Sequence, residues 1–329
     1  MHLIQPALTG HTARYLRRYL HHHTTTSIAS FTPSFERQTT ESIAPFIPAF
    51  ERQERPDLCP YFVKGASYME EQKGNTFYFY KNMSNKRRAT ADIIGSIVAS
   101  ILGICPEPHT LVEFNTYLDN QPQKILATRS QDRGPHWESV YQIGAFTELF
   151  QDPDFKKHSI PNFSSTWVGS RLMQNMAIGP HNLPYLNENQ LFDFDQRADT
   201  LPLKQSPLGW FFIPENTDTF VPVPSLETTL AKMTHIQEHQ IHLKIRLSHP
   251  ELHDFINQCP GIDPDYAQQI LLDTNANIDA LTDTLYTLSQ EPTLLTNITM
   301  IMRLSIGHTI PKETLSNQVP YFPNTPRYA

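Results

Sequence analysis

Several residue types that define well-known protein classes are scarce in this chain. Only three cysteines occur among its 329 residues, without a Cys-x-x-Cys spacing, so neither a disulfide framework nor a cysteine-based zinc site is expected. Glycine is low, at 12 residues, and the G-x-x-x-x-G-K-[ST] and G-x-S-x-G motifs are both missing, which argues against P-loop enzymes and α/β-hydrolases. We therefore do not expect a disulfide-stabilised or cysteine-zinc protein, a P-loop enzyme or an α/β-hydrolase.

Long apolar runs and a positive net charge are missing as well. The most apolar window, IIGSIVASILGI, is 12 residues long, whereas a membrane-spanning helix needs about 20. The first residues contain no apolar stretch of the kind found in a secretory signal. The net charge is −7, and a nucleic-acid-binding protein would need a basic stripe. We expect a protein of the cytoplasmic type, with no transmembrane segment and no nucleic-acid partner.

A tandem repeat is the clearest positive feature of the sequence. Residues 27–38, SIASFTPSFERQ, recur as residues 42–53, SIAPFIPAFERQ, with a period of 15. One interpretation is a duplicated linker, or a strap that packs its phenylalanines on the main domain. The other is a bivalent peptide that docks into a protein partner and gains avidity from its two copies. The residues that would make this contact are Phe31, Phe35, Phe46 and Phe50.

Patterns along the rest of the chain predict an α+β fold, with strands first and helices later. Short aromatic or β-branched runs predict strands at 61–64, 77–81, 110–114 and 125–128, with a polar turn at 70–75 between the first two. Apolar residues at helical spacing predict a helix that begins near Thr90, with Asp92 in its first turn, and ends near Gly103. Further helices are predicted at 167–176, 226–247 and 265–288, with a short strand at 191–194. This predicts three regions: an N-terminal segment (1–58), a main domain (59–310) and an extended tail (311–329).

The strand that ends in Lys81, followed by the helix that ends in Leu-Gly-x-x-Pro, resembles a known arrangement. It is similar to the strand lysine and the αC helix of atypical protein-kinase-like folds, in the HipA-type and phosphoinositide-kinase-like branches that include bacterial effector kinases. The resemblance implies a two-lobed fold, with a small strand-rich lobe and a helical lobe, that binds ATP and Mg²⁺. Lys81 would bind phosphate, and Asp92 would replace the usual glutamate that fixes this lysine. An effector kinase would act in the host-cell cytoplasm.

A second stretch carries the rest of the resemblance. Residues 172–183 look like a shortened catalytic loop, and Leu191-Phe192-Asp193-Phe194-Asp195 looks like the metal-binding strand. The comparison implies that Asn182 and Asp193 bind the metal. However, the family pattern G-x-x-D-x-H-x-x-N is reduced to Gly-Pro-His-Asn, without the aspartate that accepts the substrate proton. Either His181 or Asp195 replaces that base, or the domain is a pseudokinase that serves as a protein-interaction module.

Simpler explanations exist for the same residues. Lys81 at a strand end could be a solvated charge, Asp92 an acid in the first turn of a helix, and the two acids beside Phe194 the outward side chains of an edge strand. The order of the groups along the chain is what favours a phosphotransferase acting on a protein, a lipid or a small molecule.

A separate metal motif lies in the predicted helix 226–247. His235-Ile236-Gln237-Glu238-His239 is an H-x-x-E-H string, the pattern of inverted zinc proteases, and this keeps a zinc hydrolase as a remote alternative. The apolar stripe of this helix predicts that both histidines lie on its solvent-facing side, where a shielded catalytic cleft is not expected.

Overall fold

The computed structural model describes residues 42–83, 85–105, 107–131, 138–139, 163–175, 184–185, 194, 197, 211, 226–291, 293–294 and 298. The chain divides into two compact units. One comprises residues 41–201 and 241–277, and the other comprises residues 1–40, 202–240 and 278–329. We call them the sheet unit and the helical unit. Within the described part, no helix is both long enough and apolar enough to cross a membrane.

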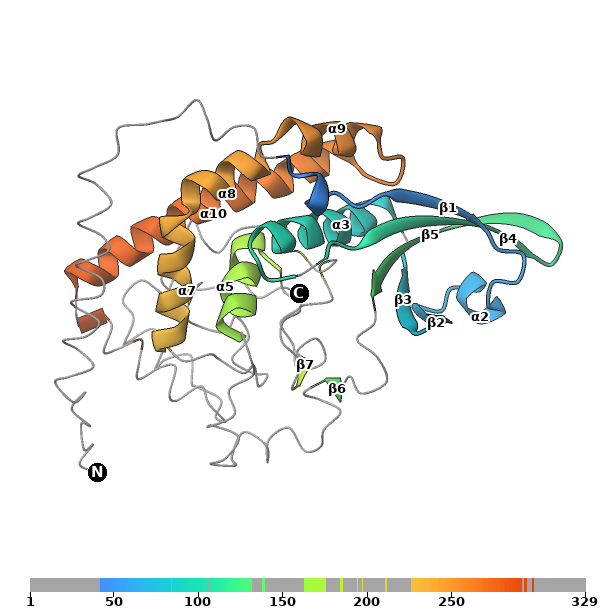
Figure 1. Ribbon diagram of the computed structural model, residues 1–329, viewed down its shortest axis with the longest axis horizontal. Coiled ribbons are helices and arrows are strands. Elements are labelled where there is room, and N and C mark those ends of the chain that lie inside the picture. Colours follow the sequence, from blue (N-terminus) through green and yellow to red (C-terminus); the bar gives the residue numbers. More distant parts are fainter. Residues whose placement is uncertain are drawn as a thin grey trace, which may run out of the picture. The chain divides into compact units, whose positions relative to one another are not determined.

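A five-stranded mixed sheet organises the sheet unit (Figure 1). Its spatial order is β1-β4-β5-β3-β2, and β1 runs parallel to β4 while the other neighbours are antiparallel. The antiparallel pair predicted at 110–114 and 125–128 is confirmed. The bounds are β1 Phe50–Glu54, β2 Tyr68–Lys73, β3 Thr76–Asn82, β4 Thr110–Leu118 and β5 Gln121–Gln131.

Two tight turns join the hairpins of this sheet. Gly74, with a φ of 65°, lies between β2 and β3, while Asp119 and Asn120, with φ of 50° and 61°, lie between β4 and β5. Glycine, asparagine and aspartate tolerate this left-handed backbone, which matches the twist of a two-residue hairpin. Part of the predicted polar turn at 70–75 is therefore wrong, because residues 70–73 belong to β2.

The predicted strand at 61–64 is also wrong. These residues form most of the short helix α2, Pro60–Val63, in which proline occupies the first turn. Proline fits the first helical position, because its missing N–H would be unpaired there anyway. Phe62 from α2 is fully buried against the sheet, within a cluster of core side chains. That cluster contains Leu58, Phe62, Tyr80, Val112, Phe114, Ile125 and Ala127.

Helix α3, Lys86–Ile101, contacts the sheet at β4 and β5 (Figure 1). Asn85 caps it by accepting a hydrogen bond from the Arg88 N–H at 2.9 Å. The predicted start at Thr90 is therefore wrong, and Asp92 lies beyond the first turn. The run Lys86-Arg87-Arg88 concealed this start, since bases in a first turn oppose the helix dipole.

Helices dominate the described C-terminal part, which confirms the α+β class. The predicted helix 226–247 is split into α7 and α8 at His239, and Ile241, just after the break, is exposed. The helix predicted at 167–176 is found as α5, which begins and ends a few residues earlier, and the helix predicted at 265–288 is confirmed as α10. The bounds are α5 Phe163–Met173, α7 Leu226–Glu238, α8 Gln240–Leu247, α9 Pro250–Gln258 and α10 Pro264–Gln290.

The second copy of the repeat belongs to the sheet unit. Its first half forms the 3-10 turn η1, Ala44–Phe46, and its last residues form most of the edge strand β1. The copy is thus integrated into the fold by main-chain pairing with β4. The first copy, residues 27–38, and the tail after residue 311 lie outside the described residues.

Candidate functional site

Asp92 is the centre of a buried polar cluster between α3 and the sheet. Its side chain is fully buried, where an unpaired carboxylate would be strongly unfavourable. His109 Nδ1 donates to Asp92 Oδ2 at 2.9 Å, and the Phe194 backbone N–H donates to Asp92 Oδ1 at 3.2 Å. The Thr128 hydroxyl also hydrogen-bonds to this carboxylate. Both carboxylate oxygens are therefore paired.

These partners determine the charge of Asp92. Burial, the largest effect, would raise the pKa of this carboxyl group. The charge and hydrogen bond of His109, the charge of Lys81 and the hydrogen bond of Thr128 outweigh it and lower the pKa from 3.8 to about 2. Asp92 is therefore an anion at neutral pH, in spite of its complete burial.

Lys81 approaches the same carboxylate from β3. Its neighbour Tyr80 belongs to the core cluster beside α2, and side chains alternate across a strand, so Lys81 points to the opposite face of the sheet. Thr128 lies directly opposite Lys81 in the β3–β5 register. Lys81 is buried, with 7% of its surface exposed, and its charge lowers the pKa of Asp92. The interpretation of Lys81 as a solvated charge is therefore wrong.

Phe194, the one residue of the LFDFD segment that the structure describes, contacts Asp92. Besides the backbone hydrogen bond, its ring meets the His109 ring edge-on at 5.3 Å between centroids. Gly95, one turn after Asp92 in α3, permits this approach, because a Cβ atom there would lie 2.7 Å from the Phe194 Cβ. A residue about a hundred positions downstream thus packs directly on the helix that carries the acid.

Arg197 holds the same segment a few residues further on. It forms an ion pair with Asp273 of α10, and its backbone forms an isolated bridge with Asn175. The predicted base candidates His181 and Asp195, and the predicted metal ligands Asn182 and Asp193, lie outside the described residues. Of the six predicted site residues, the structure places Lys81 and Asp92, and it brings those two together.

His109 is the member of the cluster that sequence reasoning missed. It is buried just before β4, where its backbone N–H donates to Ser96 Oγ at 2.9 Å while its ring pairs with Asp92. A lone histidine before a strand carries no spacing signal, and this chain has 15 of them. The sequence offers one indication: His109 is a polar residue between the helix predicted to end near Gly103 and the strand predicted at 110–114.

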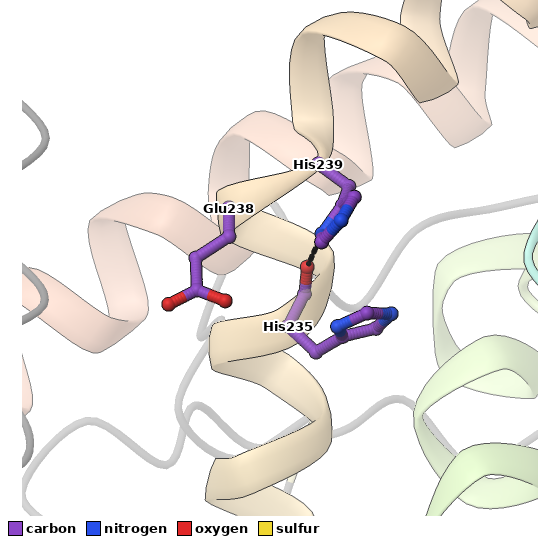
Figure 2. Close-up of side chains that lie close together, drawn as sticks. All are labelled: His235, Glu238 and His239. Carbon is purple, nitrogen blue, oxygen red and sulfur yellow. Dashed lines mark hydrogen bonds between the residues drawn. The ribbon is translucent and has the colours of Figure 1, made fainter.

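The H-x-x-E-H string forms a second cluster, in the helical unit. Figure 2 shows His235, Glu238 and His239 on consecutive turns at the end of α7. One ligand atom from each lies within 4.8 Å of the others, and all three residues are exposed, as predicted. Burial lowers the pKa of His235, and the charges of His239 and Lys232 lower it further. This cluster can bind a cation at the surface, but exposed ligands do not provide the shielded cleft of a hydrolase.

His239 has a defined tautomer in this cluster. Its Nδ1 donates to the His235 carbonyl oxygen at 2.9 Å (Figure 2). A carbonyl only accepts, so Nδ1 carries a proton, and in the neutral imidazole Nε2 is then the nitrogen with the lone pair. Histidine ligands of metal ions commonly have this second hydrogen bond.

Comparisons with known proteins add one likeness to these observations. No protein-family model and no curated protein matches the chain. Among solved structures, the chain is similar to the crystal structure of a Helicobacter pylori proinflammatory kinase, CtkA. The match has 11% sequence identity and a TM-score of 0.42, and it covers 75% of this chain and 100% of that chain. At this identity and TM-score, the likeness says nothing about activity.

Proposed function

We propose that this chain is an atypical kinase-like phosphotransferase acting on a protein, a lipid or a small molecule. The observation that supports this most is the convergence on Asp92 of Lys81 from β3 and Phe194 from the LFDFD segment. A kinase site needs a lysine for phosphate, an acid that fixes this lysine, and a nearby strand that carries the metal-binding aspartate. The residues proposed for these tasks, Lys81, Asp92 and Asp193, follow one another in the expected order along the sequence.

Each residue then has one task. Asp92 orients Lys81, whose ammonium group binds phosphate oxygens of the nucleotide. Asn182 and Asp193 supply the amide and carboxylate oxygens that Mg²⁺ prefers. His181 or Asp195 accepts the proton of the substrate hydroxyl. Bound Mg²⁺ and ATP supply the transferable phosphoryl group and neutralise its charge, so the protein contributes positioning and electrostatic stabilisation.

A pseudokinase that acts as a protein-interaction module is the alternative. Two observations favour it. The sequence lacks the usual catalytic aspartate, and the loss of a positioned base costs about 10²–10⁴-fold in rate. In addition, His109 pairs with the acid that should be reserved for Lys81. In this case the polar cluster around Asp92 only stabilises the packing of α3 on the sheet, and the chain has no phosphotransfer activity.

Thermal unfolding with and without magnesium and ATP separates the two functions. A phosphotransferase site predicts stabilisation that requires both ligands, about 2.7 kcal/mol at a concentration roughly a hundredfold above Kd. Lys81→Ala and Asp193→Ala should abolish it. Lys64→Ala and Asp254→Ala, at exposed positions outside the cluster, are the matched controls and should keep it.

The contrary outcome is equally clear. If no nucleotide shifts the unfolding midpoint of the wild-type chain, the phosphotransferase proposal fails and the interaction module remains. If ATP does stabilise the chain, a second assay measures transfer of the terminal phosphate of ATP to added protein, lipid or small-molecule acceptors. This assay tests whether the chain that binds the nucleotide also catalyses phosphotransfer.

A further inference from the structure

The first half of the second repeat copy is held by α9. Ser42 Oγ donates to the Glu251 carboxylate at 2.9 Å, and the Ile43 N–H donates to the same group at 3.0 Å. The Ile43 side chain is fully buried. Further along, the Arg246 guanidinium lies 5.6 Å from the centroid of the Phe46 ring. These contacts use three side chains that the two copies share.

The second half pairs with the edge of the sheet. Phe50 to Glu54 lie parallel to Leu111 to Asn115 of β4. Arg129 of β5 donates two hydrogen bonds to the Glu51 carboxylate, at 2.7 and 2.6 Å, and Arg52 forms an ion pair with Glu113 at 3.3 Å. We use the name repeat groove for the β4 edge from Leu111 to Asn115 together with Arg129, Arg246 and Glu251.

The two copies agree wherever the second copy makes these contacts. Nine of the twelve positions are identical between residues 27–38 and residues 42–53. The three that differ are occupied in the second copy by Pro45 and Ala49, which are exposed, and by Ile47, which is half-buried. The contact residues Ser42, Ile43, Phe46, Phe50, Glu51 and Arg52 correspond to Ser27, Ile28, Phe31, Phe35, Glu36 and Arg37.

We infer that residues 27–38 are a second ligand for the repeat groove and exchange with residues 42–53 within the same chain. Each hydrogen-bonding, ionic and buried apolar group that the groove recognises in the second copy is present in the first. Main-chain pairing with an exposed strand edge depends little on the identity of the incoming strand. The duplication thus supplies two interchangeable edge strands for one sheet.

Two features make the second copy the usual occupant. The hydrogen bonds continue past the repeat, from Asn115 Nδ2 to Glu54 at 2.6 Å and from the Arg55 N–H to the Asn115 oxygen at 2.8 Å. The first copy is followed instead by Thr39 and Thr40. When the first copy docks, residues 39–53 must also close a loop, at an entropic cost.

A double-mutant cycle in the full chain tests the exchange. Ile43→Asp places a charge in the buried site, so the second copy is weakened and the first takes its place. Ile28→Asp alone should leave the thermal midpoint unchanged, Ile43→Asp should lower it moderately, and the double variant should lower it by more than the sum. The matched pair Ala29→Asp and Ala44→Asp, at a position exposed in the second copy, should leave the thermal midpoint unchanged, alone or together.

Two outcomes of the cycle would overturn the inference. If the double variant is no less stable than Ile43→Asp, the first copy does not rescue the groove. If Ile28→Asp alone is as damaging as Ile43→Asp, the first copy has a fixed site of its own.

Disulfide trapping gives a second measurement that does not depend on stability. Arg52 lies opposite Glu113 in the β1–β4 register, so the equivalent Arg37 should reach Glu113 when the first copy docks. In a Cys59→Ser background, Arg37→Cys with Glu113→Cys should form an intrachain disulfide, faster when Ile43→Asp is added. Arg52→Cys with Glu113→Cys is the positive control, and Thr25→Cys with Glu113→Cys is the negative control.

The form of the trapped product identifies the occupant. An intrachain product supports the exchange. An interchain product shows that the groove takes a segment from a second copy of the chain, and no product above the negative control shows that the first copy does not dock. Either of the last two results overturns exchange within one chain.

Discussion

Asp92 carries a full negative charge without contact with solvent. Such a carboxylate persists only when each oxygen has a partner, and here the partners come from a helix-to-strand connection, two strands and a distant segment. Removing His109, the partner with the largest favourable effect on this charge, leaves the buried carboxylate less well compensated. The cluster therefore ties the stability of the sheet unit to the same atoms that the proposed function uses.

His109→Ala should destabilise the chain by about 3–5 kcal/mol, because it leaves Asp92 buried without its main partner. The pKa of Asp92 is about 2 in the fold and 3.8 as an ordinary side chain, so the stability it contributes is complete above pH 3.8 and is lost as the pH falls toward 2. The difference in the free energy of unfolding between His109→Ala and the wild-type chain should therefore become smaller as the pH falls from 3.8 toward 2. Urea unfolding at a series of pH values measures it.

Exposed His242 provides the comparison for this substitution. His242→Ala should lie close to wild type at each pH. If His109→Ala behaves in the same way, the hydrogen bond to Asp92 contributes nothing measurable, and the buried charge does not depend on this partner.

The His235, Glu238 and His239 cluster predicts a zinc site at the surface. Two imidazoles one turn apart are good ligands for Zn²⁺, and the hydrogen bond of His239 Nδ1 leaves Nε2 available. One Zn²⁺ per chain should bind by calorimetric titration, and His239→Ala should weaken binding, whereas His242→Ala should change it little. Purified protein that takes up no zinc would end both the site and the zinc hydrolase alternative.

At the scale of elements, the contact between α3 and the LFDFD segment depends on one missing side chain. Gly95→Ala would place a Cβ atom 2.7 Å from the Phe194 Cβ. Alanine favours a helix by about 1 kcal/mol over glycine, but overpacking a core costs about 1–3 kcal/mol. We expect a net loss of stability in thermal unfolding, together with a smaller stabilisation by magnesium and ATP.

Ser100→Ala, on the same helix, serves as the control. The Ser100 hydroxyl is buried without a hydrogen-bond partner, so its removal should be neutral or stabilising. If Gly95→Ala proved as stable as Ser100→Ala and still responded to nucleotide, the close packing of Phe194 would have no energetic importance.

Which elements the sequence predicts depends on how regular their patterns are. The apolar stripe of α3 and the apolar runs in β4 and β5 are strong, so these three elements were predicted, although the start of α3 was placed too late. The strand predicted at 61–64 fails because a run of three aromatic and aliphatic residues followed by a lysine fits a strand or a helical turn equally well. The break between α7 and α8 at His239 was missed because the polar residues there fit a continuous helix.

The candidate site was predictable only in part, for a related reason. Lys81 and Asp92 were found because a strand lysine followed by an apolar helix is a recognisable order. His109 was not found, because its importance arises from a contact made across the fold with Asp92 rather than from its neighbours in sequence. The roles of His181, Asn182, Asp193 and Asp195 stay predictions.

At the scale of the whole molecule, the sheet includes residues that the sequence assigned to an N-terminal segment. A chain that begins at Cys59 lacks β1, so the β4 edge from Leu111 to Asn115 is left unpaired. Unpaired strand edges promote association. We expect such a chain to aggregate in light-scattering measurements after size exclusion, whereas a chain that begins at Ser42 should keep the edge covered. Equal behaviour of the two truncations would contradict this role of β1.

The parallel pairing of β1 with β4 also implies an order of assembly. The β2–β3 and β4–β5 hairpins connect neighbours in sequence through tight turns, and such local structures form in microseconds. β1 must wait for its partner β4, which follows two strands and two helices later in the chain, and distant pairings form late. A newly made chain therefore passes through a stage in which the other four strands are paired but the β4 edge is still unpaired. If the two repeat copies exchange as inferred, two stretches that agree at nine of twelve positions would shorten that interval, since either could pair with the open strand edge first.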